Sequence, residues 1–345
     1  MVFIGGFTFA RIVSAIFLTT LATGPALAQS NDVNIYTYRE PGLIKPALEL
    51  FTKTTGIKVN TLFAADGLAE RMRSEGSHSP ADLLIAVDIG RLQQAIDLGV
   101  TQPVKSEVLE KAIPAPFRDP QGQWYALTLR SRIAYVAKDR VADEALTYES
   151  LADAKWRGKI CIRSGQHPYN TSLIAAFLAK HGEATTEAWL KGVKANLARK
   201  PSGGDREGAR DILAGVCDLA IGNSYYVGLM RNAKDEEQRK WGNAIRTINP
   251  TFEGGGTHVN ISGVVMARHA PNRANAAKLM DFLVSDSAQH VFSDLNYEYP
   301  VVAEAPVAET VKSFGALRPD TMPLNEVGKN RKAASMLVDR VGFDN

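Results

Sequence analysis

The chain of 345 residues carries 40 Lys and Arg against 37 Asp and Glu, so its charges nearly balance at a formal +3. No basic block and no interleaving of aromatic with basic residues occurs along it, which excludes the usual pattern of nucleic-acid binding. The length exceeds what one hydrophobic core usually supports, and two lobes are therefore predicted.

Residues 1–28 have the pattern of a cleavable export signal. Arg11 is their only charged residue, the stretch 12–21 is largely apolar, and Ala26–Ala28 offers the small residues that a signal peptidase requires. A membrane anchor is the alternative, but the apolar run is short and is broken at Gly24-Pro25. We expect a mature chain that is exported and soluble, because no lipid-accepting cysteine follows the signal.

Short apolar runs alternate with amphipathic helical patterns after the signal, which is typical of an α/β protein. Runs rich in Val, Ile and Leu are expected where helices cover both faces of a parallel sheet. For the N-terminal lobe, 29–127, the predicted strands are 33–38, 57–60 and 82–87, and the predicted helices are 43–54, 67–75 and 89–98.

Two apolar runs, 124–129 and 133–137, are predicted as strands that carry the chain out of the first lobe. The C-terminal lobe is expected over 128–249, the chain returns to the first lobe around 250–300, and 301–345 is a helical segment packed on the C-terminal lobe. Further strands are predicted at 159–162, 217–221 and 259–266, and further helices at 148–151, 171–181, 186–197 and 272–284.

Cys161 and Cys217 are the only cysteines of the chain. Two cysteines in an exported protein fit one disulfide bond, whereas two buried thiols are the alternative. In the chain-entropy account, closing a loop of this size contributes about 4 kcal/mol.

Two tyrosines stand side by side in the run Gly222-Asn223-Ser224-Tyr225-Tyr226. A phenolate is a hard anionic donor that suits hard, highly charged cations, and such a cation lowers the tyrosine pKa from its ordinary value near about 10. A half-buried packing pair is the alternative. In a continuing strand the two side chains would point to opposite faces, so both reach one ion only if the backbone turns.

Two other segments fall at predicted strand ends, where open parallel sheets bind ligands. Alternation places Tyr36, Tyr38 and Glu40 on one face while the first strand lasts, although Tyr36 can instead be buried beneath the site. The second segment, 166–170, contains His167 and Tyr169 and precedes a predicted helix. His167 is otherwise an ordinary loop residue.

Counting charges sharpens the metal hypothesis. Three phenolates balance a ferric ion, and a fourth anionic donor leaves one negative charge in excess. That donor is Glu40, a Tyr38 phenolate or a small anion such as carbonate. Arg130 or Arg132, between the two crossing strands, offsets the excess charge unless these arginines are solvated surface residues.

Signatures of common enzymes are absent: the chain has no Gly-x-Ser-x-Gly, no Walker loop, no His-Glu-x-x-His and no Cys-x-x-Cys. Gly254-Gly255-Gly256 is predicted to be a turn, and His258 is at most an outer neighbour of the site. Two alternatives to metal binding remain. The tyrosines can form an aromatic wall for a small organic or anionic solute, or Glu40 and Asp66 can act as paired carboxylates of a secreted hydrolase.

With these motifs the mature chain resembles the periplasmic ferric-iron-binding proteins of bacterial ABC importers, a branch of the bacterial transferrin-like solute-binding proteins. The resemblance runs almost end to end, and the tyrosine pair with Tyr169 upstream is its most specific part. The matching segments are 36–42, 79–84, 151–159, 223–226, 256–263 and 296–301.

The resemblance implies two lobes joined by a strand hinge, which close over Fe(III) in a central cleft. It implies Tyr169, Tyr225 and Tyr226 as ligands from one lobe, with Arg130 near the metal or its accompanying anion. Many members carry a His just after the first strand, whereas this chain has Glu40-Pro41. The first-lobe ligand is therefore Tyr38, Glu40, water or an exogenous anion.

The function implied by this resemblance is that of a non-enzymatic, monomeric periplasmic protein. It would capture Fe(III), with a synergistic anion such as carbonate, and deliver it to an ABC transporter permease in the inner membrane.

Overall fold

A ten-stranded sheet forms the centre of the chain from Asn31 to Asn345, which packs as one compact unit in the computed structural model. The structure describes residues 1–6 and 31–345. The predicted signal segment 1–28 therefore lies, apart from residues 1–6, outside the described residues.

The strands follow the order β2-β1-β3-β9-β5-β7-β6. Strands β4, β8 and β10 lie beside this path, with β4 paired to β9 and the other two to β5. The bounds are β1 Asp32–Thr37, β2 Lys58–Phe63, β3 Leu83–Ala86, β4 Thr101–Gln102, β5 Tyr125–Ala137, β6 Ile160–Cys161, β7 Leu219–Asn223, β8 Ile245–Ile248, β9 Val259–Ala267 and β10 Tyr299–Pro300.

Strand β5 joins the two halves of this sheet. Its residues from Tyr125 to Ser131 pair with β9, and those from Arg132 to Ala137 pair with β7 and β8. The prediction of two separate strands, 124–129 and 133–137, was therefore wrong, because one continuous strand includes the polar residues between them. We call the half with β1–β4, β9 and β10 the first lobe, and the half with β6–β8 the second lobe.

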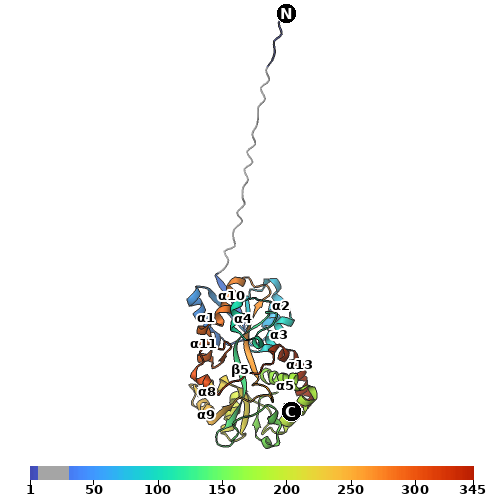
Figure 1. Ribbon diagram of the computed structural model, residues 1–345, viewed down its shortest axis with the longest axis vertical. Coiled ribbons are helices and arrows are strands. Elements are labelled where there is room, and N and C mark those ends of the chain that lie inside the picture. The colour runs from blue at the N-terminus through green and yellow to red at the C-terminus, as the bar shows by residue number, and fades with distance from the viewer. Residues whose placement is uncertain (7–30) are drawn as a thin grey trace. The chain divides into compact units, whose positions relative to one another are not determined.

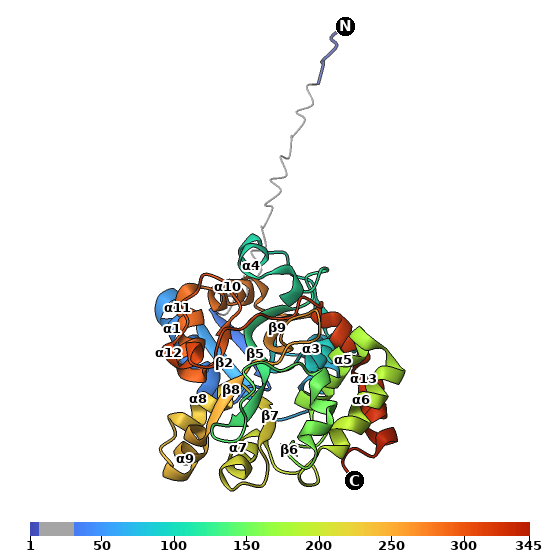
Figure 2. The same ribbon diagram turned by 60° about the horizontal axis from the view of Figure 1, so that its bottom comes forward.

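Helices cover both halves of the sheet. Figure 1 shows β5 between helices α1–α4 and α10 on one side and helices α8 and α9 on the other, and Figure 2 shows α5, α6 and α13 together. The bounds are α1 Pro41–Thr55, α2 Leu68–Glu75, α3 Ile89–Asp97, α4 Glu107–Ala112, α5 Pro168–His181, α6 Glu183–Ala195, α7 Asp205–Leu213, α8 Tyr225–Arg231, α9 Glu236–Ala244, α10 Arg273–Leu283, α11 Asp286–Asn296, α12 Glu309–Lys312 and α13 Leu324–Val341.

Short 3-10 helices complete the secondary structure, at Gly76–His78, Ala115–Phe117, Glu149–Ala152 and Ala154–Trp156. The long helix α13 packs against α5 of the second lobe and also contacts α3 of the first. The residue boundaries expected for the lobes, 29–127 and 128–249, stay a prediction, as does the assignment of 301–345 to the second lobe.

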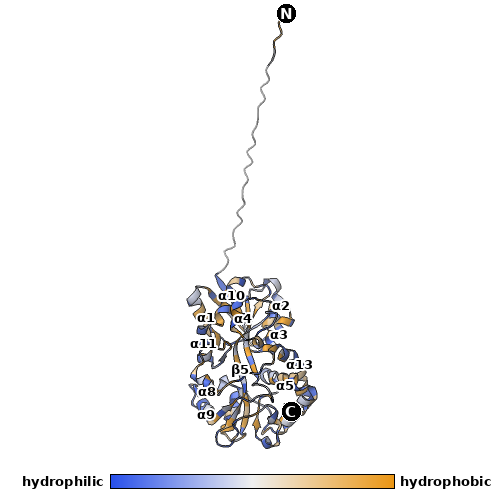
Figure 3. Cartoon of the chain, in the orientation of Figure 1, coloured by the Kyte–Doolittle hydropathy of each residue, from blue (hydrophilic) through white to orange (hydrophobic). Residues whose placement is uncertain are grey.

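The core follows the apolar strands. Every residue of β3, β5 and β9 is buried, as expected for strands covered on both faces, and Figure 3 shows apolar colour concentrated in the interior strands. Of the helices that the structure describes, none combines the length and apolar content needed to cross a membrane.

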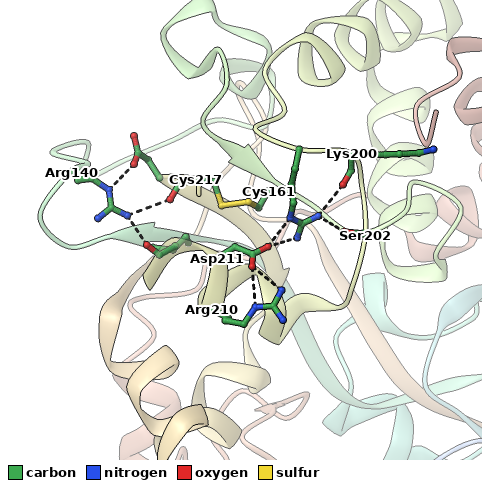
Figure 4. The surroundings of a disulfide bond; sticks show 10 residues. Arg140, Cys161, Lys200, Ser202, Arg210, Asp211 and Cys217 are labelled. Carbon is green, nitrogen blue, oxygen red and sulfur yellow. Dashed lines mark hydrogen bonds and ion pairs between the residues drawn. A yellow bond between two sulfur atoms is a disulfide. The ribbon is translucent and has the colours of Figure 1, made fainter. Parts of the chain in front are cut away.

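A disulfide bond joins Cys161, at the end of β6, to Cys217, just before β7, which confirms the predicted bridge. Both cysteines are buried. Figure 4 shows hydrogen bonds around it: Asp211 accepts from Arg210, and Arg140 donates to the Cys217 carbonyl. This cross-link anchors one end of β7, whose other end leads to the tyrosine pair.

Candidate metal centre

The backbone turns at the tyrosine pair, as metal binding by both tyrosines requires. Strand β7 ends at Asn223, and helix α8 begins at Tyr225. Gly222 lies against the Tyr135 ring so closely that a methyl group there would overlap it. The predicted turn is confirmed, whereas the helix that follows it was missed.

Tyr169 reaches the pair from the first turn of α5. This helix begins at Pro168, whose fixed φ suits a first helical position, and the His167 ring accepts a hydrogen bond from the Tyr169 N–H at 3.3 Å. The helix therefore starts before the predicted residue 171, and His167 is its N-cap rather than a free loop residue.

The three tyrosines meet. The hydroxyl oxygens of Tyr169 and Tyr225 lie 3.2 Å apart, and the ring centres of Tyr225 and Tyr226 lie 4.3 Å apart. We call these three residues the tyrosine cluster. Phenol oxygens this close can share one coordination sphere.

The cluster lines a cavity of about 220 Å³ together with residues of the first lobe. Tyr38 and Glu40, the candidates for a first-lobe ligand, line the same cavity, as does Arg130 from the crossing strand β5. The cavity also includes Arg39, Leu43, Val87, Arg206, Leu229, Asn296 and Glu298. Candidate donors from both halves of the fold thus face a common space.

The environment keeps Tyr225 and Tyr226 protonated without a cation. Burial raises the pKa of Tyr225 well above its ordinary value, and the neighbouring Tyr169 and Tyr226 add to this rise, while Arg130 opposes it. Burial also raises the pKa of Tyr226, with Tyr169 and Asp205 acting in the same direction. Ionising these phenols together therefore requires a strong positive charge at the site.

Arg130 and Arg132 differ in their hydrogen-bond partners, although the guanidinium carbon of each lies 6.0 Å from the Tyr169 ring centre. One terminal nitrogen of Arg130 donates to the carbonyls of Val87 and, at 2.6 Å, Ile261. Arg132 is buried and forms an ion pair with Asp205 at 2.6 Å. Arg130 lines the cleft cavity, whereas the charge of Arg132 is already balanced by a carboxylate.

The three residues predicted to share one face of the first strand do not all lie on it, because β1 ends at Thr37, before Tyr38 and Glu40. Tyr36 donates to Glu75 at 2.8 Å and is absent from the cavity lining, in keeping with its burial elsewhere. Tyr38 accepts a hydrogen bond from the Ala69 N–H at 3.0 Å, and burial raises its pKa.

Glu40 is exposed at the start of α1 and also lines the cavity. Its proposed partner in the hydrolase hypothesis, Asp66, does not line this cavity, and its side chain is 88 % exposed beside Arg91. The structure therefore does not bring these two carboxylates together in the cleft.

Three charged cavity residues were missed from the sequence. A buried ion pair at 2.8 Å joins Arg39 to Glu298, and Arg206 lies with its guanidinium 5.5 Å from the Tyr226 ring centre. Arg39 and Glu298 both lie within the segments that carry the family resemblance, which was the only available signal for them.

His258 and the glycine run lie outside the cleft cavity. Burial, with help from the charge of Arg132, lowers the His258 pKa to about 3, so this ring is neutral. It lines a small space together with Tyr169 and Arg132. The predicted turn at Gly254-Gly255-Gly256 is confirmed, with Gly254 at a φ of 67°.

Two lobes on a shared sheet, joined by crossing strands and enclosing a polar cleft, define a solute-binding protein with the fold of periplasmic binding proteins. The family described as bacterial extracellular solute-binding protein matches residues 78–318, and the chain belongs to it.

Within this family, the chain is similar to proteins that are named for iron. The chain is 41 % identical over 317 residues to iron uptake protein A1 of Synechocystis, covering 91 % of this chain and 88 % of that one. A solved Bordetella ferric binding protein is 56 % identical, with a TM-score of 0.88 and coverage of 91 % and 100 %. A Trichodesmium protein solved with iron and citrate is 40 % identical, with a TM-score of 0.87 and coverage of 90 % and 99 %.

Proposed function

We propose that this chain is a periplasmic protein that captures Fe(III) and delivers it to an ABC importer. The observation that carries this proposal is the tyrosine cluster, where two phenol oxygens lie 3.2 Å apart in a cleft that both lobes line. The similarity to ferric binding proteins and to iron uptake protein A1 points to the same cargo. Export by the segment 1–28 belongs to this proposal.

The proposed ligands from the second lobe are Tyr169, Tyr225 and Tyr226 as phenolates. Their three negative charges balance Fe(III), and hard oxygen donors favour this ion over Fe(II). Tyr38 or Glu40 is the proposed donor from the first lobe, since both line the cavity. A donor from each lobe gives the closed arrangement a higher affinity for iron, which is the condition for iron-driven closure.

A small anion is proposed to complete the shell beside Arg130. The cavity of about 220 Å³ is larger than a metal ion needs, and Arg130 and Arg206 line it. Carbonate fits the charge count. The citrate bound with iron in the Trichodesmium structure makes a carboxylate chelate the alternative co-ligand.

We propose that the protein is a non-enzymatic carrier and a monomer. In hinge-type binding proteins, closure over the ligand is the conformational change available for a partner to recognise. The proposed partner is the permease of an inner-membrane ABC transporter.

Visible absorption tests this function. Phenolate-to-iron charge transfer colours a ferric complex, so purified protein loaded with ferric citrate should be red to orange. The double variant Tyr225→Phe/Tyr226→Phe should stay colourless, whereas Tyr36→Phe, which removes a phenol outside the cavity, should keep the colour. Colourless wild-type protein would instead favour a small organic or anionic solute.

A further inference from the structure

Arg132 connects the segments that carry the tyrosine cluster. Its first terminal nitrogen donates to Asp205 at 2.6 Å and to the Asn223 side chain at 3.1 Å, and its second donates to the Asn170 side chain at 2.6 Å. The Arg132 side chain is 2 % exposed. One buried guanidinium on β5 therefore binds α7, the end of β7 and the start of α5.

The acceptors of Arg132 adjoin the ligands along the chain. Asn170 directly follows Tyr169, and Asn223 lies just before Tyr225. Asp205 strengthens the connection, because the same carboxylate oxygen that pairs with Arg132 accepts the Asn223 backbone N–H at 2.9 Å. Arg132 thus fixes the spacing between the two segments from which the cluster projects.

We propose that Arg132, held by Asp205, is a positioning residue that sets the phenol oxygens of the tyrosine cluster at the spacing that one ferric ion requires. This inference rests on the proposed ferric site. Arg132 does not line the cleft cavity, and its guanidinium carbon lies 6.0 Å from the Tyr169 ring centre, so it acts through the tyrosines and the segments that carry them rather than by touching the metal or its anion.

The guanidinium is suited to this role because its donors form a rigid planar fork. A lysine ammonium keeps the charge but is a compact donor on a flexible stem, and it cannot reproduce the fork geometry. Groups that orient metal ligands are worth about 10–100-fold in metal affinity. The conservative variant Arg132→Lys therefore separates positioning from charge.

A control of the same kind exists in the second lobe. Arg199 donates to Asp211 at 2.7 Å and also pairs with it through a terminal nitrogen at 2.6 Å, near the disulfide. The Arg199 side chain is 21 % exposed, and neither partner lines the cleft cavity. Arg199→Lys disturbs a largely buried arginine–aspartate pair of this lobe, whose Asp211 lies further along α7, and Arg199 contacts none of the three acceptors of Arg132.

The experiment measures ferric affinity by chelator competition, the charge-transfer absorption per bound iron, and the melting temperature of each variant. For Arg132→Lys we expect affinity to fall by about 10–100-fold and absorption per iron to decrease, because fewer phenolates reach the metal. Arg199→Lys should keep wild-type affinity and absorption whatever its melting temperature. Affinity and absorption unchanged in Arg132→Lys would overturn the proposal.

Asp205→Asn provides a second variant of nearly equal size if Arg132→Lys does not fold. It weakens the hold on Arg132 and should lower affinity and absorption in the same direction; wild-type values would overturn the proposal. The proposed function fails separately, if the wild-type protein itself shows no charge-transfer band with ferric iron.

Discussion

A buried neutral histidine should make the metal-free protein sensitive to mild acid. His258 is 3 % exposed, and its Nε2 has no hydrogen-bond partner among the described residues. Its backbone N–H donates to the Tyr148 hydroxyl at 3.1 Å, and its backbone carbonyl accepts from the backbone N–H of Arg132 at 3.1 Å. Protonating this ring would place a second positive charge near Arg132.

The magnitude follows from the two pKa values. Burial lowers the His258 pKa to about 3, whereas an unfolded histidine titrates near about 6.5. Below about pH 6.5 the unfolded chain binds more protons than the folded one, so this contribution is present above that pH and is lost as the pH falls toward 3. Between about pH 7.5 and about pH 5 the loss is ~2 kcal/mol.

Urea unfolding of iron-free protein at these two pH values measures the effect. Replacing His258 by Gln removes the titrating ring, so the difference in unfolding free energy between wild type and variant should change by ~2 kcal/mol between the two pH values. His290→Gln, at an exposed position on α11, is the control and should follow the wild type. An acid dependence unchanged in His258→Gln would refute this reasoning.

Three further results are expected. Gly228→Ala places a methyl group against the Tyr297 ring and should lower the free energy of unfolding by about 1–3 kcal/mol, which thermal melting measures. An unaltered melting temperature would contradict this packing. Replacing Cys161 and Cys217 by Ala removes a cross-link over 56 residues and should lower the urea-unfolding free energy by about 4 kcal/mol, whereas an equal midpoint would show that the bridge contributes little. Burial raises the pKa of both cluster tyrosines on α8, so ferric binding should release protons. Competition titrations should therefore show that the affinity for iron rises with pH, by up to about tenfold per released proton per pH unit. An affinity that does not change with pH would exclude phenolate ligation.

The sequence predicted elements well where a regular apolar pattern decides the structure. Strands β1 and β3 and helix α3 lie close to their predicted ranges, because Val, Ile and Leu follow the required period and are buried accordingly. Prediction failed where the structure of a segment depends on residues far away in the sequence. Strand β5 continues through Arg130-Ser131-Arg132, since the charge of Arg132 is satisfied by Asp205, which is 73 residues away.

The sequence was enough to select the tyrosines that lie together in the cleft, but it said less about the residues around them. Tyrosine chemistry and the family resemblance identified the cluster, whose members lie 56 residues apart or are adjacent in the chain. Nothing in the sequence showed that Arg39 pairs with Glu298, because these residues are separated by 259 positions. They come together only because the folded sheet holds β1, which precedes Arg39, and β10, which follows Glu298. Helix α8 was missed because it is short and contains Gly228.

A crystal structure of the iron-loaded protein tests the central claim most directly. We expect one Fe(III) bonded to the phenolate oxygens of Tyr169, Tyr225 and Tyr226 together, with a first-lobe group or a small anion beside Arg130 completing the shell. Iron held elsewhere, or a cleft in which these three oxygens do not share one metal ion, would contradict the account.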